Sequence, residues 1–336
     1  MHSSLALLTL FGVRAYAWGA LGHETIAYVA SNLVKNNTQL WAQHVLGDNS
    51  SNYLATVSTW PDSWRRTDEG AFSAPFHYID AEDNPPEACN IDYERDCGEE
   101  GCVVSAIANY TQRVQQPGVL SDTEVNYALR FLVHFLGDIT QPLHVEALAL
   151  GGNEIDVEFD GEDWNLHSIW DTAMPDKLRG VENVTLSDAQ AWASDLTADI
   201  KAGKYKACAQ SWIQGDDIAD AKRSALAWAT DSNAYVCSVV LPDGVESVNA
   251  TELGGSYYES AVETVELQIA KGGYRLAHWL DQLAAAQQNN TAYKRSVAPV
   301  TGAVDLSGRD LLPAPRELSK AKLARRAVGW DCAHSH

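Results

Sequence analysis

The sequence predicts a mostly α-helical protein that carries one small β-hairpin. Several long stretches repeat apolar residues at the spacing of a buried helix face. Only one short stretch alternates apolar and polar residues ahead of a turn, as a hairpin strand does. The chain has 336 residues, 46% of them hydrophobic and 11 of them Trp, which is enough to bury the core of one large domain.

The first predicted helix covers residues 22–36, and its apolar face consists of Ile26, Val29, Ala30, Leu33 and Val34. A second helix begins at Ser121, because Ser followed three residues later by Glu124 forms a capping box. We expect Pro142 to stop this helix, since proline lacks the amide hydrogen that a helix interior needs.

The predicted hairpin turns at Asp160-Gly161, because this pair tolerates the left-handed backbone of a two-residue hairpin turn. The residues that alternate before it are Ile155, Val157 and Phe159. Further helical patterns cover residues 187–203, 216–241 and 256–287. Helices therefore dominate the predicted fold.

Residues 1–17 are typical of a secretory signal peptide. An apolar stretch over residues 5–13 is too short to span a bilayer, and the small-x-small cleavage site Ala15-Tyr16-Ala17 follows it. Cleavage there would make Trp18 the new N-terminal residue. No later apolar run is long enough for a transmembrane helix, so we expect no membrane association.

Six N-glycosylation sequons favour the same secretory route independently, and we expect all of them on the surface. Their acceptors are Asn36, Asn49, Asn109, Asn183, Asn249 and Asn289. We therefore expect a secreted, extracellular glycoprotein with its folded domain at residues 18–288. Residues 289–336 contain recurrent prolines and the dibasic pair Lys294-Arg295. They are interpreted as a flexible tail or a propeptide, and these alternatives stay open.

The six cysteines suggest a few disulfides rather than a disulfide-dense scaffold. Cys97 and Cys102 enclose a short acidic loop and are expected to pair. The other four could pair in three ways, which sequence alone does not resolve; they are Cys89, Cys208, Cys237 and Cys332. We take Cys89 and Cys237 as disulfide-bonded and leave the other two unassigned.

Histidines and aspartates with regular spacing are the candidate functional residues. His134 and Asp138 are four apart on one predicted helix, so both project from one face, and His167 and Asp171 repeat that spacing. The other candidates are Asp62, His77, His144 and His23. After cleavage, the amino group and carbonyl oxygen of Trp18 could also chelate a metal.

These groups outnumber the four or so ligands that one zinc ion takes. Three ions would use nearly the whole set if one Asp bridged two of them. Asp and His ligands without Cys fit a hydrolytic zinc site better than a purely structural one. On spacing alone, the alternative that each His-x-x-x-Asp pair is a surface or capped ion pair stays open.

The net charge of −21 argues against a protein that binds nucleic acid along an extended basic surface. It does not exclude an enzyme whose local positive charge comes from metal ions. The candidate residues stand in segments that resemble, in order, the zinc-dependent single-strand nucleases of fungi and plants (type I nucleases). The segments are WGALGHETIA (18–27), WPDS (60–63), HYIDAEDNPP (77–86), HFLGD (134–138), QPLHV (141–145), GGN (151–153) and NLHSIWD (165–171).

The resemblance covers residues 18–288 and implies a helical bundle like that of zinc-dependent phospholipase C, with three Zn²⁺ ions. The first ion would be bound by Asp62, His77, His134 and Asp138. The second would be bound by the Trp18 amino nitrogen and carbonyl oxygen, His23 and the bridging Asp138. The third would be bound by His144, His167 and Asp171.

The resemblance also implies roles around the metals. Asp80 would orient the attacking water and Arg65 would contact phosphate, although Arg65 could instead pair with nearby acids. Tyr78 would stack on a base and Asn153 would bind the base edge, with a core tyrosine and a turn asparagine as the alternatives. Asp83 stands where some family members have Lys, so no role is transferred to it.

The function implied is a monomeric endonuclease that cleaves single-stranded DNA and RNA to 5′-phosphate products and also acts on 3′-nucleotides. Two other classes stay open. A secreted zinc phospholipase C would share the fold and ligands, and activity on phosphatidylcholine would identify it. A zinc-stabilised binding protein would show no turnover.

Overall fold

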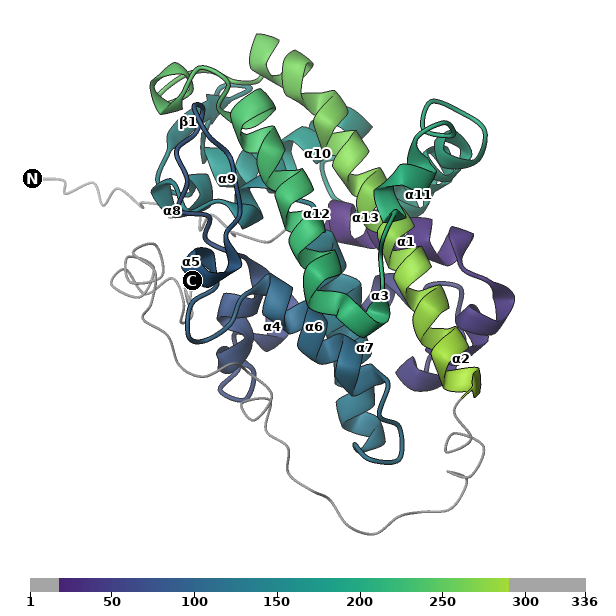
Figure 1. Ribbon diagram of the computed structural model, residues 1–336. Coiled ribbons are helices and arrows are strands. Elements are labelled where there is room, and N and C mark those ends of the chain that lie inside the picture. The colour runs from purple at the N-terminus through teal and green to yellow at the C-terminus, as the bar shows by residue number, and fades with distance from the viewer. Residues whose placement is uncertain (1–17, 290–336) are drawn as a thin grey trace, which may run out of the picture.

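The computed structural model describes residues 18–289, with the side chains of the last two residues left out (Figure 1). The predicted signal peptide and residues 290–336 lie outside the described residues. The major helices are α1 (Ala20–Leu33), α2 (Asn36–Leu46), α6 (Val103–Val114), α7 (Asp122–Asp138), α11 (Leu186–Lys201), α12 (Ala221–Tyr235) and α13 (Ser256–Asn289). The prediction of a mostly α-helical fold is confirmed.

Short helical segments connect these helices and carry many of the candidate residues. They are α3 (Ala55–Ser58), α4 (Trp60–Trp64), η1 (Ala71–His77), α5 (Tyr93–Asp96), η2 (Pro142–Val145), α8 (Ala149–Gly152), α9 (Leu166–Ser168), η3 (Ile169–Ala173), α10 (Met174–Arg179), η4 (Ala209–Ile213), η5 (Ile218–Asp220), η6 (Val236–Val240) and η7 (Val245–Ser247).

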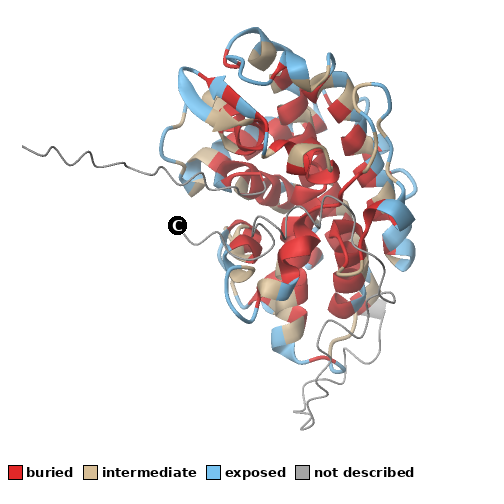
Figure 2. Cartoon of the chain, turned by 90° about the vertical axis from the view of Figure 1, so that its left-hand side faces the viewer, coloured by how far each residue is buried: buried red, intermediate tan, exposed pale blue. Residues whose placement is uncertain are grey.

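The helices pack around one continuous core. α1 lies between α11 and α13, and α6 packs against both α7 and α12. Buried residues fill the interior of the bundle in Figure 2, and five large indoles are fully buried there: Trp18, Trp170, Trp192, Trp228 and Trp279. None of the described helices has an apolar stretch that could cross a bilayer.

The capping box predicted for α7 is present. The Ser121 hydroxyl accepts the Glu124 amide hydrogen at 3.2 Å, and the Glu124 carboxylate accepts the Ser121 amide hydrogen at 2.9 Å. The helix ends at Asp138, before Pro142, which instead begins η2. The early end of α7 matters because it places Asp138 at a helix terminus beside neighbouring segments.

The hairpin is also confirmed, with β1 (Asp156–Phe159) antiparallel to β2 (Glu162–Asn165). Val157 and Phe159 are buried, and Asp160-Gly161 adopts positive φ angles of 53° and 80°. The left-handed turn therefore joins the strands as the Asp-Gly pair predicts.

Two predicted helix boundaries were wrong. The helix expected over residues 216–241 begins at Ala221, because the Asp220 side chain caps the amide of Arg223, and the π-helical turn η6 follows it. The helix expected over residues 22–36 ends at Leu33. There the chain extends, and the Lys35 amide donates to Asp281 Oδ1 at 3.0 Å before α2 begins.

The structure contains the disulfides Cys89–Cys237 and Cys97–Cys102, as expected. Cys208 is exposed and has no disulfide partner among the described residues, and Cys332 lies outside them.

Four of the sequon asparagines are exposed, namely Asn36, Asn49, Asn183 and Asn249. The expectation of a surface position was wrong for Asn109, which is 5% exposed within α6. A glycan attached there would have no room in the packed core. The side chain of Asn289 is not among those described.

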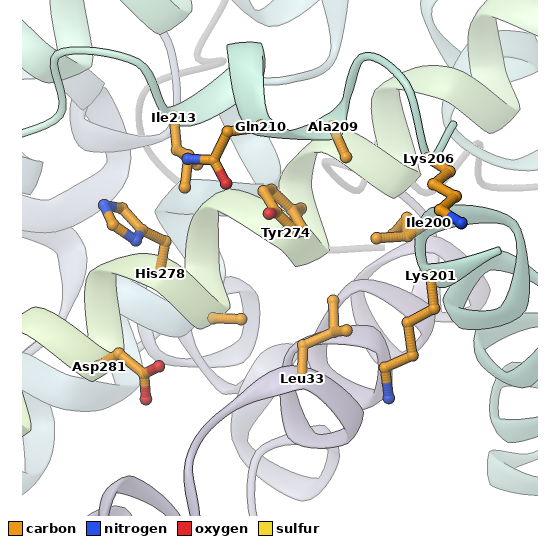
Figure 3. A pocket seen from close by; sticks show the side chains of 11 residues that line it. Leu33, Ile200, Lys201, Lys206, Ala209, Gln210, Ile213, Tyr274, His278 and Asp281 are labelled. Carbon is orange, nitrogen blue, oxygen red and sulfur yellow. The ribbon is translucent and has the colours of Figure 1, made fainter. Parts of the chain in front are cut away.

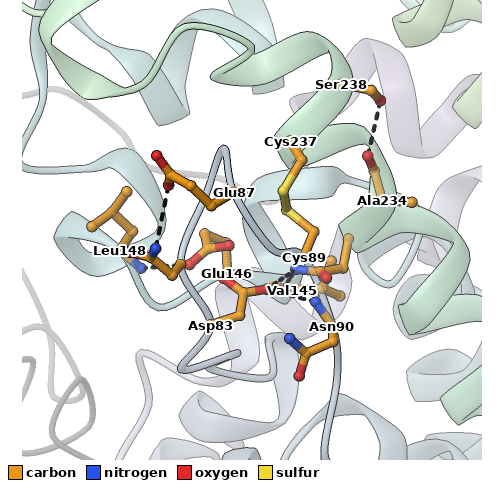
Figure 4. The surroundings of a disulfide bond; sticks show 12 residues. Asp83, Glu87, Cys89, Asn90, Val145, Glu146, Leu148, Ala234, Cys237 and Ser238 are labelled. Carbon is orange, nitrogen blue, oxygen red and sulfur yellow. Dashed lines mark hydrogen bonds between the residues drawn. A yellow bond between two sulfur atoms is a disulfide. The ribbon is translucent and has the colours of Figure 1, made fainter.

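Two carboxyl groups, a half-buried one at Asp83 and a buried one at Glu146, join the loop before Cys89 to the segment after His144 (Figure 4). Asp83 and Glu146 are hydrogen-bonded to each other. Asn233 Nδ2 donates to Asp83 Oδ2 at 3.0 Å, and the amides of Ala147 and Leu148 donate to Glu146 Oε1. Burial raises the pKa of Glu146 to about 8 and also raises the pKa of Asp83, so the pair holds a proton at neutral pH.

This proton makes stability depend on pH. Between about pH 5 and 8 the folded state holds a proton that the unfolded chain releases, so the free energy of unfolding falls as pH rises. Glu146→Gln keeps an acceptor for the amides and donates to Asp83 without titrating. At pH 8 this variant should regain the free energy of unfolding that the unsubstituted protein loses as pH rises. We expect its melting temperature at pH 8 to be higher than that of the unsubstituted protein by about 2–4 °C for each kcal/mol of that free energy.

Thermal melts of the protein at pH 5 and pH 8 measure this effect. Glu154→Gln, at an exposed glutamate on the following loop, is the matched control and should retain the original pH slope. If the melting temperature of Glu146→Gln depended on pH as strongly as that of the unsubstituted protein, the proposal that Asp83 and Glu146 share a proton would be contradicted.

Candidate metal centre

Asp138, the last residue of α7, lies between two groups of histidines. Its Oδ1 is 3.1 Å from His23 Nε2 on α1. Its Oδ2 is 3.0 Å from His77 Nδ1 and 3.2 Å from His134 Nε2. Asp62 Oδ1 on α4 is 3.7 Å from those same two nitrogens. The two oxygens of Asp138 therefore face different ligand sets, which is the arrangement a bridging carboxylate needs.

A second cluster forms where η2, α9 and η3 meet. His167 Nε2 is 3.1 Å from Asp171 Oδ2, and His144 Nε2 is 3.9 Å from Asp171 Oδ1. Gln141 Nε2 donates to Asp171 Oδ1 at 2.6 Å and fixes this carboxylate. His144 and His167 are 4% and 7% exposed, whereas His77 and His134 are 0% exposed. This cluster is therefore the more open of the two.

Backbone carbonyls orient three of the imidazoles. His134 Nδ1 lies 2.6 Å from Ser58 O, His144 Nδ1 lies 2.8 Å from His77 O, and His167 Nδ1 lies 2.6 Å from Gly151 O. A carbonyl oxygen only accepts, so each Nδ1 carries the proton and each Nε2 presents a lone pair to its cluster. Carbonyl partners of this kind fix the ring orientation of metal-binding histidines.

Burial keeps several of these imidazoles neutral. It lowers the pKa of His77 to about 3, with a contribution from Arg65, and lowers the pKa of His144 to about 4. Burial would also lower the pKa of His134, but the carboxylates of Asp138 and Asp62 outweigh it and raise that pKa. Neutral imidazole is the form that binds metal ions.

The close approach of α1 to α7 depends on a glycine. A Cβ atom at Gly137 would lie 2.8 Å from His23 Nδ1 and 3.0 Å from His23 Cε1. Only glycine leaves room for the His23 ring, which stacks on His134 with 4.0 Å between ring centroids. Gly137 therefore permits α1 to contribute a histidine to the centre.

The N-terminal segment is fixed beside both clusters. The Gly19 amide donates to the carbonyl of Asp171 at 2.7 Å. Trp18 is 0% exposed, and its indole Nε1 donates to Thr140 Oγ1 at 3.2 Å. The residue predicted to become the N-terminus is thus packed against the segment that follows α7.

The donor set fits zinc. Ligand atoms bound tetrahedrally at about 2.0–2.1 Å from zinc lie about 3.3–3.4 Å apart. The separations between ligand atoms within the two clusters, 3.0 to 3.9 Å, bracket that value. Three groups of candidate ligand atoms meet this geometry: His23 with His134 and Asp138, Asp62 with His77 and His134, and His144 with His167 and Asp171.

Comparison with known proteins identifies the family. The family model described as S1/P1 Nuclease matches residues 18–285. The chain belongs to the S1/P1 nuclease family. Nuclease P1 of Penicillium citrinum is 54% identical over 270 residues, which are 80% of this chain and 99% of that protein. Nuclease PA3 of a Penicillium species has the same identity and coverage. Nuclease S1 of Aspergillus oryzae is 49% identical over 283 residues, covering 84% of this chain and 96% of that protein.

In this S1/P1 family member, the predicted substrate residues differ in burial and in their contacts. Asp80 is fully buried and Tyr78 is 9% exposed. Arg65 Nη2 is 3.2 Å from Asp62 Oδ1, so the guanidinium does pair with an acid, and that acid belongs to the first cluster. Asn153 Nδ2 donates to Leu150 O, which leaves its buried Oδ1 without a hydrogen-bond partner among the described residues.

Several supporting residues were missed by the sequence reasoning. Ser58 and Gly151 act only through their carbonyl oxygens, and Thr140 acts as the acceptor for Trp18. A backbone carbonyl has no sequence signature, so no pattern could have identified the first two. Gln141 and Gly151 lie within the resembling segments, but their contacts with Asp171 and His167 were not foreseen.

Proposed function

We propose that this protein is a secreted, zinc-dependent endonuclease that hydrolyses single-stranded DNA and RNA to 5′-phosphate products. We propose that it binds three zinc ions, acts as a monomer, and also removes the phosphate of 3′-nucleotides. Membership of the S1/P1 nuclease family supports a nuclease. The observation that carries the metal assignment is the pair of Asp138 oxygens facing separate histidine sets.

The three zinc sites follow the residues implied by the resemblance. Asp62, His77, His134 and Asp138 would hold the first ion, and His144, His167 and Asp171 the third. The second would use His23, Asp138 and the amino nitrogen and carbonyl oxygen of Trp18. The family match begins at Trp18, which supports cleavage after Ala17 and secretion. Five exposed or undescribed sequon asparagines remain candidates for glycosylation.

When bound, zinc ions would supply a water of lowered pKa and positive charge for the phosphate oxygens. The protein's own side chains would then orient the attacking water and stabilise the charge that develops on the phosphate. The buried Asp80 carboxylate accepts a hydrogen bond from the attacking water and directs its lone pair toward phosphorus. In-line attack expels the 3′ oxygen, so the phosphate stays on the 5′ side of the break.

Arg65 would stabilise the charge that develops on the phosphate. Its guanidinium, held by Asp62 at 3.2 Å and 20% exposed, donates to a non-bridging oxygen. Preference for single strands follows because a base must leave its stack to reach Tyr78 and the free Oδ1 of Asn153. This oxygen accepts from an amino or imino group on the base edge.

The experiment uses protein purified from culture medium. We expect it to cleave single-stranded DNA and RNA much faster than duplex DNA, with 5′-phosphate ends by mass spectrometry. EDTA should abolish cleavage and added zinc should restore it, because the ligands cannot activate water alone. Turnover of phosphatidylcholine without cleavage of single strands would favour the phospholipase alternative. Stoichiometric zinc without any turnover would favour a binding protein.

A further inference from the structure

A groove lies at the far end of α1 from the metal centre. Its volume is about 450 Å³, and it is bordered by α1, α11, η4 and α13 (Figure 3). Leu33, one of its lining residues, follows His23 by ten positions on α1, a distance of about 15 Å along the helix axis. The groove is therefore separate from the proposed catalytic clusters.

The groove has an apolar floor and a polar rim. The floor is formed by Leu33, Ile200, Ile213, Tyr274 and Ala277. The side chains of Leu33, Ile200, Ile213 and Tyr274 surround one space in Figure 3. Lys201, Lys206 and Gln210 are exposed at its rim. Cys208 is exposed between Lys206 and Ala209, which both line the groove. An exposed thiol thus stands at the edge of an apolar depression.

The chain itself supplies a matching segment. Of the six cysteines, four form the two disulfides, which leaves Cys208 and Cys332. Cys332 follows Val328 and Trp330, both apolar, and it lies 43 positions after Asn289, the last residue of α13. The same helix, α13, forms one wall of the groove and precedes the segment that contains Cys332.

Charge favours the return. Residues 290–336 contain eight Lys or Arg and four Asp or Glu, a net charge of +4. The whole chain has a net charge of −21, and Arg14 is the one charged residue before Trp18. Residues 18–289 therefore have a net charge of −26. A cationic segment is attracted to a strongly anionic domain, most of all at low ionic strength. This attraction acts on the domain as a whole, because Lys201 and Lys206 make the rim of the groove itself basic.

We propose that residues 328–332 occupy this groove, with Trp330 against the apolar floor and Cys332 joined to Cys208 by a disulfide. A disulfide brings two Cα atoms to about 4.4–6.8 Å, and Trp330 is within about 7 Å of Cys332 along the chain. The indole therefore reaches the floor when Cys332 is at the rim. A random coil of 43 residues has an end-to-end distance of about 35–40 Å, which is enough for the return.

Formation of the bond is an oxidation. Each thiol loses its proton, the two sulfurs join, and the two electrons reduce a disulfide-bonded oxidant to two thiols. The secretory route in our proposed function supplies this class of oxidant. If the chain were cleaved after Arg295, residues 296–336 would remain attached to the domain through this bond.

The bond is tested on full-length protein isolated from culture medium. We expect no free thiol under denaturing conditions, and peptides containing Cys208 and Cys332 linked to each other within one chain. Cys332→Ser should expose one thiol per chain. Two free thiols alongside intact Cys89–Cys237 would overturn the proposal, as would a Cys208–Cys332 link between two chains. Loss of Cys89–Cys237 as well would instead contradict the proposed secretory route.

Occupation of the groove is tested by equilibrating the full-length protein in glutathione buffers. Trp330→Ala and Ile213→Asp should each lower the effective concentration of the two thiols about tenfold, because they remove contacts that hold the segment in place. Leu311→Ala, far from Cys332 in sequence, is the control and should leave the effective concentration of the two thiols unchanged. The same effective concentration of the two thiols in all of these variants would overturn docking in the groove. Nuclease activity should be the same in all of them.

Discussion

Asp138→Asn is expected to reduce nuclease activity at least about 10³-fold and to remove more than one of the three proposed zinc ions. Asn has the same shape as Asp but lacks the negative charge and one of the two oxygens. In the structure those oxygens face His23 on one side and His77 with His134 on the other. One substitution should therefore weaken two sites together, leaving the cluster around Asp171 filled.

Zinc content measured by atomic emission on the purified variant tests this expectation. Asp231→Asn is the control, because Asp231 is a partly exposed carboxylate that pairs with Lys271 and Arg275 and belongs to none of the candidate ligand groups among the described residues. The control should lower the melting temperature but keep all of its zinc. Retention of the full zinc complement in Asp138→Asn would contradict a bridging role.

The sequence predicted the parts of this protein that depend on local spacing. His134 with Asp138 and His167 with Asp171 each stand four apart, and the short distances within both pairs follow from one helical turn. The capping box of α7 and the Asp-Gly hairpin are local in the same sense, and both are present. Spacing alone did not show that the two pairs would meet other histidines, and that expectation came from the resemblance to a family.

The sequence reasoning failed where packing between distant segments decides the outcome. α6 was not predicted, although Val103, Ile107, Tyr110 and Val114 have helical spacing that could have revealed it. Because α6 packs against both α7 and α12, Asn109 on it is buried despite its sequon. The proton shared by Asp83 and Glu146 likewise needs two segments to meet, which no local pattern encodes.

The largest effect outside the clusters is expected from the N-terminus. Signal-peptide cleavage one residue early, or an added Gly before Trp18, would convert the Trp18 amino group into an amide. An amide nitrogen has no available lone pair, so the proposed chelate of amino nitrogen and carbonyl oxygen would lose half of its donors. We expect the extended protein to lose at least about 10²-fold of its activity and to bind one zinc ion weakly.

Trp18→Phe in the correctly processed protein separates this effect from packing. It keeps the free amino group and an aromatic ring. It removes the hydrogen bond to Thr140, which costs about 1 kcal/mol, and it also removes part of the packing of a fully buried indole, which costs about 1 kcal/mol or more. This variant should keep its zinc and most of its activity. N-terminal mass mapping establishes where each chain begins. If the extended protein were fully active while Trp18→Phe was impaired, Trp18 would act through its buried indole, and a fourth donor for the ion beside His23 would have to come from another group.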